Sequence, residues 1–329
     1  MKKLVVTGGA GFIGSHFLRR VLSDDIWSDY QVHNLDILTY AGNLITLSDI
    51  DQNPRYHFHK LDIRDQVMID RCFQELKPDA CVNFAAESHV DRSIDNSNVF
   101  LETNILGANN LANSMCVHGS GDKRFLQVST DEVYGDLNLK DPAFTEKTPL
   151  KPSSPYSSSK TAADLLIQAF GRTHGLNYII TRCSNNYGSY QYPEKLIPVV
   201  IDRLMNNQKI PVYGNGQNQR DWIHVEDHCR GIESAFFSSY SSEVFNFGGE
   251  TELSNIELVK SILQIMNKNE NQIEFVKDRA GHDFRYAVDF TKASQKLNWK
   301  PAQNFSSGLE QVVEWYQKNS QWVTEVRTT

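Results

Sequence analysis

Two side chains that could oxidise an alcohol stand four residues apart in the segment YSSSK. Tyr156 and Lys160 would share one face of a helix, because residues i and i+4 are neighbours on a helix surface. An ammonium beside a phenol stabilises the phenolate, so the spacing predicts that the pKa of Tyr156 is lowered toward the working pH and that its oxygen can take a proton. Such pairs are also common on solvated helix faces. Their chemistry therefore depends on what else the chain places beside them.

A second group of reactive side chains lies in QVSTDEVYG, directly after an apolar run. Its polar members are Ser129, Thr130, Asp131 and Glu132. Two adjacent carboxyls whose pKa values are pushed apart can act as a general acid and a general base. The structural alternative is a polar turn with a capping aspartate.

The glycines of GGAGFIG indicate a cofactor for this chemistry, because their spacing is typical of dinucleotide-binding turns. Gly8 permits a tight turn, Gly11 lets the backbone approach a pyrophosphate, and Gly14 lets the next helix pack close to the strand. Free N–H groups at the start of that helix attract the anion. Asp36, 22 residues after Gly14, would bond a ribose hydroxyl and repel a 2′-phosphate, so we expect NAD rather than NADP. A tyrosinate beside nicotinamide can then take the proton of an alcohol while hydride leaves its carbon.

The elements that must position these residues alternate between short apolar runs and helix-length segments. Strands are expected at 3–7, 31–35, 56–60, 80–84, 124–128 and 178–181, with a helix from about 156 to 174. This order predicts an α/β fold with a Rossmann-type doubly wound parallel sheet, whose carboxyl strand ends line the ligand crevice. Asp62 and Ile63 end the third strand at that edge, where adenine contact and helix capping both remain open.

The strict alternation weakens beyond residue 182. We expect an NAD-binding Rossmann domain over 1–184 and a smaller α/β substrate-binding domain over 185–329, from which part of 218–248 could return to the first sheet. In the second domain, 210–213 and 244–247 read as strands. The segment 254–266 reads as an amphipathic helix that Ser254 can cap.

Composition excludes several classes of protein. The 329 residues are 40 % hydrophobic and 22 % charged, which is unlike disordered, collagenous or coiled-coil chains. A net charge of −7 argues against nucleic acid and anionic membranes as partners, and no apolar stretch approaches the roughly 20 residues of a membrane span. Five cysteines without a CxxC pair predict free thiols in a reducing cytoplasm, and ten histidines without a ligand pattern predict no metal.

Taken together, eight segments carry a resemblance over residues 2 to about 316. They are TGGAGFIGSHF, LDILTYAGN, NFAAESHVDRS, STDEVYG, YSSSK, RCSNNYGSYQYPEKLIP, GNGQNQRDWIHVEDHC and DRAGHDFRYAVD. With these the chain resembles the dTDP-glucose 4,6-dehydratase family of extended short-chain dehydrogenases. The resemblance implies conversion of dTDP-glucose to dTDP-4-keto-6-deoxyglucose and water by internal hydride transfer through retained NAD. It also implies a homodimer formed through a helix bundle.

The resemblance implies roles for individual residues as well. Thr130 matches the hydroxyl that bonds the sugar O4, Asp131 the general acid and Glu132 the general base; Asp131 and Glu132 are called the acidic pair below. Tyr156 and Lys160 match the two residues that oxidise the alcohol and are called the oxidation pair. The implied cofactor-binding residues are Gly8, Gly11, Phe12, Ile13, Gly14, Asp36, Leu38, Thr39, Gly42, Asp62, Ile63, Ala85, Ala86, Thr103, Ser129, Tyr156 and Lys160. The implied substrate-binding residues are Ser88, Thr130, Asn185, Glu194, Lys195, Tyr213, Arg220, Asn255, His282 and Tyr286.

Three other functions compete with this interpretation. A dehydratase of another nucleotide sugar would use the same residues. A sugar-nucleotide 4-epimerase would share the glycine turn, Asp36 and the Tyr–Lys pair, but it needs no acid and base beside Thr130. A non-catalytic NAD-sensing regulator would need neither Tyr156 nor Lys160, and this chain has both.

Overall fold

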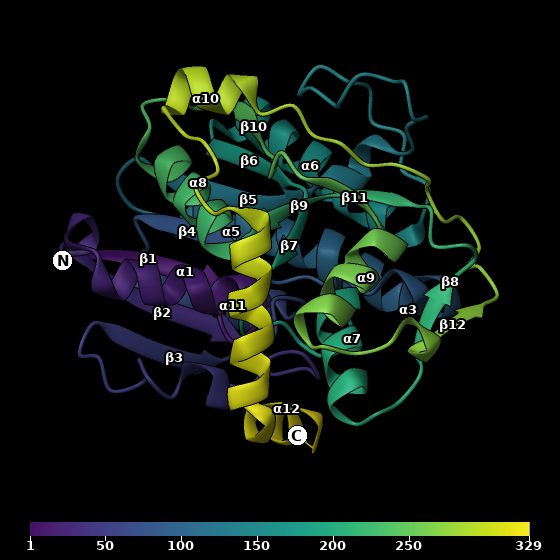
Figure 1. The fold of residues 1–329 in the computed structure, drawn as a ribbon. Helices are drawn as coiled ribbons and strands as arrows, with labels where there is room; N and C mark the ends of the chain where they lie inside the picture. Colours follow the sequence, from purple (N-terminus) through teal and green to yellow (C-terminus); the bar gives the residue numbers. More distant parts are fainter. Residues whose placement is uncertain (329) are drawn as a thin grey trace.

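A parallel sheet of seven strands forms the centre of the structure, a computed structural model that describes residues 1–328. The strands run in the order β10-β6-β5-β4-β1-β2-β3 (Figure 1). Their bounds are β1 Lys2–Thr7, β2 Tyr30–Asp36, β3 Tyr56–Lys60, β4 Ala80–Asn83, β5 Arg124–Thr130, β6 Asn177–Cys183 and β10 Glu243–Phe247. Every neighbouring pair in this sheet is parallel. The predicted doubly wound fold is confirmed.

Helices cover both faces of this sheet because its strands are apolar on both sides. Leu4 and Val6 pack into the core on one face, which helices α1 (Phe12–Ser23) and α8 (Val225–Phe237) complete. Val5 points to the opposite core, which is closed by α2 (Gln66–Leu76), α5 (Ala108–His118) and α6 (Pro155–His174). The strand order reverses between β1 and β4, so the ligand crevice of such a fold lies at their carboxyl ends.

The predicted strands match the observed ones, with shifts of one or two residues at several ends. Residues 243–247 form β10, which pairs with β6 at the edge of the seven-stranded sheet. Helix α10 (Thr291–Leu297) packs on β10, and α8 packs against α1. Elements from the second half of the chain therefore complete the first sheet.

The remaining second half forms its own apolar core. A three-stranded sheet has the order β11-β9-β7, and a two-stranded sheet pairs β12 with β8. These strands are β7 Asn185–Tyr187, β8 Ile210–Tyr213, β9 Gln219–His224, β11 Glu252–Ser254 and β12 Ile273–Val276. Helices α7 (Leu196–Met205), α9 (Asn255–Ile265), α11 (Phe305–Lys318) and α12 (Ser320–Thr328) supply the rest of the core. Figure 1 shows β8 and β12 on the side of the molecule opposite the N-terminus.

Shorter helices connect these elements. They are α3 Val90–Asp95, α4 Asn98–Phe100, the π-helical segment η3 Leu101–Gly107, and the 3₁₀ turns η1 Asp25–Trp27, η2 Leu44–Leu47, η4 Asp131–Tyr134 and η5 Glu270–Gln272. Among residues 1–328 no helix has the length and apolarity that a membrane span requires.

Candidate active site

The glycine turn between β1 and α1 leaves no room for side chains. Gly8 has φ +68°, and a Cβ on it would lie 2.7 Å from the backbone nitrogen of Ala85. A Cβ on Gly14 would lie 2.3 Å from the carbonyl oxygen of Gly8. Gly11 is the N-cap residue of α1 and offers no side-chain cap, so the start of the helix presents backbone N–H groups. This bare turn fits the pyrophosphate of a dinucleotide.

Asp36, at the end of β2, connects the glycine turn with the loop that follows β2. Its carboxylate accepts hydrogen bonds from the backbone N–H groups of Ala10 (2.9 Å) and Leu38 (2.8 Å). Burial raises the pKa of Asp36, and these two hydrogen bonds act in the opposite direction. Each carboxylate oxygen can accept more than one hydrogen bond, so Asp36 can still receive a ribose hydroxyl. The arrangement fits NAD.

One cavity of about 480 Å³ extends from this turn along the carboxyl ends of the strands. Every cofactor residue inferred from the sequence lines it except Leu38, whose N–H instead holds Asp36. The inferred catalytic residues line it as well, and so do five of the inferred substrate residues: Thr130, which is on both lists, and Ser88, Asn185, Glu194 and Lys195. The other inferred substrate residues, Tyr213, Arg220, Asn255, His282 and Tyr286, do not contribute to its lining.

The acidic pair begins where β5 ends. The hydroxyl of Thr130 accepts the N–H of Glu132 at 3.2 Å and so caps the short helix η4. Asp131 is buried, with one carboxylate oxygen 3.2 Å from the Thr130 hydroxyl and the other without a partner within residues 1–328. Burial, followed by the negative charges of Glu132 and Asp221, raises the pKa of Asp131 well above its ordinary value. This direction of shift favours the protonated form that a general acid needs.

Glu132 lies in a different electrostatic setting. Burial raises its pKa, but three cations oppose this effect, first Arg279 and then Lys195 and Arg220. For Asp131, burial and two negative neighbours come first, and only the hydrogen bond with Thr130 and then one cation, Arg220, oppose them. The two adjacent carboxyls are therefore pushed apart, with Glu132 the more readily ionised of the two.

Helix α6 begins where the oxidation pair requires it. Ser154 and Ser157 form a capping box, Pro155 occupies the first turn, and Gly175 ends the helix with φ +67°. The predicted helix is confirmed, and it directs both Tyr156 and Lys160 into the cavity.

The expected lowering of the pKa of Tyr156 is wrong for the protein alone. Burial and then the negative charge of Glu132 raise it well above its ordinary value, and a hydrogen bond from Thr130 opposes them only in part. The ammonium of Lys160 donates to the carbonyl oxygen of Val128 at 2.7 Å. Burial lowers the pKa of Lys160, which Asp164 partly restores. The i, i+4 spacing places Lys160 in the cavity lining, as predicted. Its charge does not offset the effect of burial on the pKa of Tyr156.

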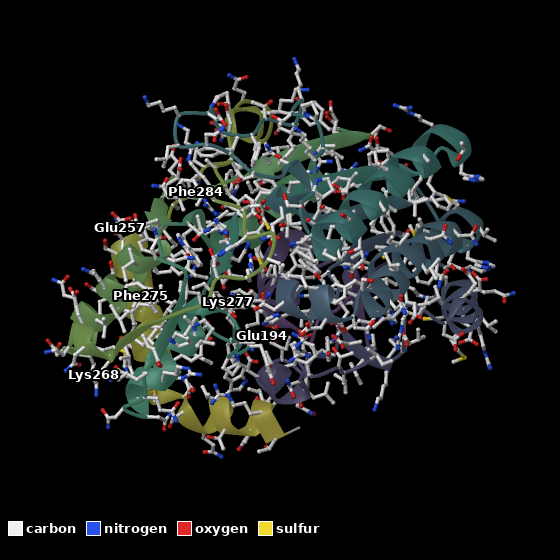
Figure 2. All side chains as sticks on the ribbon, turned by 90° about the vertical axis from the view of Figure 1, so that its right-hand side faces the viewer. Glu194, Glu257, Lys268, Phe275, Lys277 and Phe284 are labelled. Carbon is white, nitrogen blue, oxygen red and sulfur yellow. The ribbon has the colours of Figure 1, made fainter. Side chains whose placement is uncertain are left out.

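The substrate residues in the cavity meet across the two halves of the chain. The ammonium of Lys195 donates to the carbonyl oxygen of Ser88 at 2.7 Å. Glu194 accepts from the hydroxyl of Tyr40 at 3.1 Å and lies 3.5 Å from the guanidinium of Arg92. In Figure 2, Glu194 lies near the middle of the molecule, between the two halves.

The substrate residues outside the cavity lining form a second group near Glu132. The guanidinium of Arg220 lies 4.3 Å from the centre of the Tyr286 ring and donates to the carbonyl oxygen of Asp283 at 2.9 Å. Burial and then the negative charge of Glu132 raise the pKa of Tyr286 well above its ordinary value, so this ring lies within electrostatic range of Glu132. The rings of Tyr213 and His282 lie 6.2 Å apart, and Asn255 begins α9.

The sequence reasoning missed Arg279 and Asp91. Arg279 contributes the largest opposing charge on Glu132, and its guanidinium lies 3.4 Å from the carboxylate of Asp91. Both residues stand inside segments that carried the resemblance, DRAGHD and SHVDRS. Within residues 1–328 no group of three or more His, Cys, Asp or Glu side chains is arranged to hold a metal ion.

Comparison with known proteins agrees with this geometry. Residues 5–312 match a family model described as GDP-mannose 4,6 dehydratase. The chain is 45 % identical to a dTDP-glucose 4,6-dehydratase of Neisseria meningitidis over 340 residues, covering 98 % of this chain and 95 % of that one. It is 45 % identical to that of Salmonella typhimurium over 348 residues, covering 99 % and 96 %.

Solved structures give the same result. DesIV, a dTDP-glucose 4,6-dehydratase from Streptomyces venezuelae solved with NAD bound, superimposes with a TM-score of 0.94 at 44 % identity, covering 98 % of this chain and 99 % of that one. A UDP-glucose 4-epimerase from Thermotoga maritima is more distant, at 28 % identity and a TM-score of 0.88 over 97 % and 99 %. The resemblance drawn from the sequence motifs is confirmed. The chain belongs to the nucleotide-sugar 4,6-dehydratase family that the model describes, together with these dTDP-glucose 4,6-dehydratases.

Proposed function

We propose that the protein removes water from dTDP-glucose to give dTDP-4-keto-6-deoxyglucose. The observation that carries the proposal is the pair Asp131 and Glu132: burial and negative neighbours raise the pKa of Asp131 well above its ordinary value, whereas three cations oppose the rise that burial causes in the pKa of Glu132. An elimination needs this combination, because one group must donate a proton to the departing hydroxyl while another removes a proton from carbon. A 4-epimerase has no step that uses both.

NAD is the expected cofactor, held by the glycine turn and Asp36. When bound, it supplies a positively charged nicotinamide that accepts the hydride of C4 and later returns it to C6. The protein's task at this end is to orient the dinucleotide: Gly8 and Gly14 keep the turn bare, and Asp36 receives a ribose hydroxyl. Family members have been solved with NAD bound.

The residues divide the proton transfers among themselves. Tyr156 takes the proton of the sugar O4 as a phenolate, a form that the positive charge of bound NAD would favour relative to the protein alone, with Thr130 as its hydrogen-bonding neighbour. The resulting 4-ketone acidifies C5, from which Glu132 removes the proton. Asp131 then protonates the C6 hydroxyl, and water leaves. A hydride returned to C6 and a proton returned to C5 complete the product, and the proton taken by Tyr156 replaces the one that Asp131 gave to the water, so no proton is gained or lost overall.

The nucleotide is assigned to the second half of the chain. We place the division near residue 184, with 1–184 holding NAD and 185–329 holding the substrate, while β10 returns to the first sheet. Arg220 and Arg279 supply positive charge for a diphosphate, and Tyr213, whose side chain is exposed, can stack on the base.

The protein is further proposed to form a homodimer in the cytoplasm. Helix α6 and the neighbouring segments α3 and η3 leave large apolar side chains exposed, namely Ile94, Leu101, Leu106 and Leu165. Such side chains are typical of a contact surface when they lie on neighbouring helices. All five cysteines are free thiols, as expected in a reducing compartment.

A panel of nucleotide sugars with a mass readout tests the proposed function. Loss of one water from dTDP-glucose, with little or none from UDP-, CDP- or GDP-sugars, is the expected result. A product of unchanged mass and inverted C4 would favour the epimerase. Dehydration of GDP-mannose in preference to dTDP-glucose would keep the chemistry and reject the proposed substrate.

A further inference from the structure

Asp91 joins three segments that lie far apart in the sequence. It belongs to the short helix α3 in the first half of the chain. Its carboxylate accepts the hydroxyl of Tyr213 at 3.1 Å and lies 3.4 Å from the guanidinium of Arg279. Tyr213 ends β8, and Arg279 lies in the loop after β12, so both partners come from the second half. One carboxylate thus links the two halves of the chain.

Tyr213 and Arg279, the two partners of Asp91, lie on segments of the second half that pack against each other. Asp278 accepts the ring N–H of His282 at 2.7 Å within the loop that carries Arg279. A Cβ on Gly214 would lie 2.9 Å from the carboxylate of Asp278, so the turn after Tyr213 fits closely against the same loop. Figure 2 labels Lys277 and Phe284, the residues on either side of this loop. The two segments that contact Asp91 through Tyr213 and Arg279 are therefore packed together.

Arg279 belongs to a group of cations around the substrate region. Its charge opposes the rise that burial causes in the pKa of Glu132, as do the charges of Lys195 and Arg220. Burial and then the charge of Arg279 lower the pKa of His282. The Nε of Arg279 is buried and has no hydrogen-bond partner within residues 1–328. A guanidinium with unused donors is suited to a diphosphate, which it can bind through paired oxygens.

We propose that Asp91 is a positioning residue that makes diphosphate binding depend on the nucleoside. This inference rests on the proposed function. Asp91 holds the Tyr213 ring in place for the base, and its negative charge beside Arg279 opposes an incoming diphosphate. A ligand that carries a base gains affinity from stacking on the positioned Tyr213 ring, which outweighs the repulsion between Asp91 and the diphosphate. A diphosphate without a base experiences only the repulsion and binds more weakly.

Two variants separate these effects. Asp91→Asn keeps an oxygen that can accept the Tyr213 hydroxyl but removes the charge, whereas Asp91→Ala removes both. Asp95→Asn and Asp95→Ala, on the exposed last residue of the same helix, are matched controls. Each protein, with NAD bound, is titrated calorimetrically with dTDP and with inorganic pyrophosphate.

Both Asp91 variants should bind pyrophosphate about threefold more tightly, the scale of one partly exposed charge pair. Asp91→Asn should also bind dTDP more tightly, whereas Asp91→Ala should bind dTDP about threefold more weakly. In Asp91→Ala the ratio of dTDP affinity to pyrophosphate affinity should therefore fall about tenfold. The Asp95 variants should leave both affinities unchanged. A helix that is merely disrupted would weaken both ligands in both Asp91 variants.

Pyrophosphate binding that is unchanged or weaker in both Asp91 variants would overturn the proposal, as would a dTDP affinity that Asp91→Ala does not reduce. Wild-type protein that turns over no dTDP-glucose would overturn the proposed function instead. The pyrophosphate titrations would still test Asp91 in that case, because they involve no nucleotide.

Discussion

Replacing Asp36 by alanine should damage the fold and the cofactor site together. Asp36 is 8 % exposed, and its carboxylate accepts the N–H groups of Ala10 and Leu38, which lose these acceptors in Asp36→Ala. A buried donor left unpaired costs about 1–3 kcal/mol, so the two donors set a loss of about 2–6 kcal/mol in the free energy of unfolding. NAD loses one hydrogen bond to a charged group, and its binding should weaken by roughly 5- to 150-fold, or about 1–3 kcal/mol.

The assay is urea unfolding of the NAD-free protein, with NAD affinity measured by calorimetry at a temperature where the variant is folded. Asp49→Ala is the matched control, because Asp49 forms an exposed ion pair with Arg19 at 2.8 Å that is worth about 0–1 kcal/mol. If Asp36→Ala unfolded at the same urea concentration as the wild type and bound NAD equally well, Asp36 would neither stabilise the glycine turn nor bind the cofactor, and the reasoning would be refuted.

Three further predictions concern catalysis, the core and pH. Glu132→Gln should slow turnover by roughly 10²- to 10⁴-fold while reduced nicotinamide builds up in stopped-flow absorbance, whereas Tyr156→Phe should prevent that build-up; equal slowing without it in both would refute the division of steps. Asp164→Asn breaks a buried ion pair with Arg182 of 2.9 Å and should cost about 3–5 kcal/mol in urea unfolding, and a loss below about 1 kcal/mol would contradict this. Burial and neighbouring histidines lower the pKa of His33 to about 4, below its unfolded value near 6.5, so stability should fall as pH drops from 6.5 toward 4. His33→Gln should flatten that part of the stability profile, and an unchanged slope would refute the assignment.

The sequence predicted the first sheet well because its signals are local. Most of the six strands expected within 1–184 are short apolar runs, and the helix that carries Tyr156 has its cap at Ser154 and its stop at Gly175 within the sequence. The glycine turn was equally readable, since its steric demand acts between residues close in the chain or on adjacent strands. Other cavity-lining residues, among them Thr39, Ala86 and Thr103, were implied only by the resemblance to the family.

The rest depends on long-range contacts. The sign of the Tyr156 pKa shift is set by burial and by Glu132, which the spacing of Tyr156 and Lys160 does not contain. Arg279 meets Asp91 across 188 residues of chain, and neither residue is unusual in its own segment. The strands β7, β9, β11 and β12 are only three to six residues long, so periodicity cannot distinguish them from loops.

The path of the sugar's hydrogens tests the central claim most directly. When C4-deuterated dTDP-glucose reacts in ordinary water, the product should carry deuterium at C6, because the hydride is returned within the same sugar. When unlabelled substrate reacts in heavy water, the product should carry deuterium at C5, where Glu132 removes the proton. Deuterium recovered at C4 with none from solvent at C5, or a C6 methyl group without the C4 label, would contradict the internal dehydration proposed for this site.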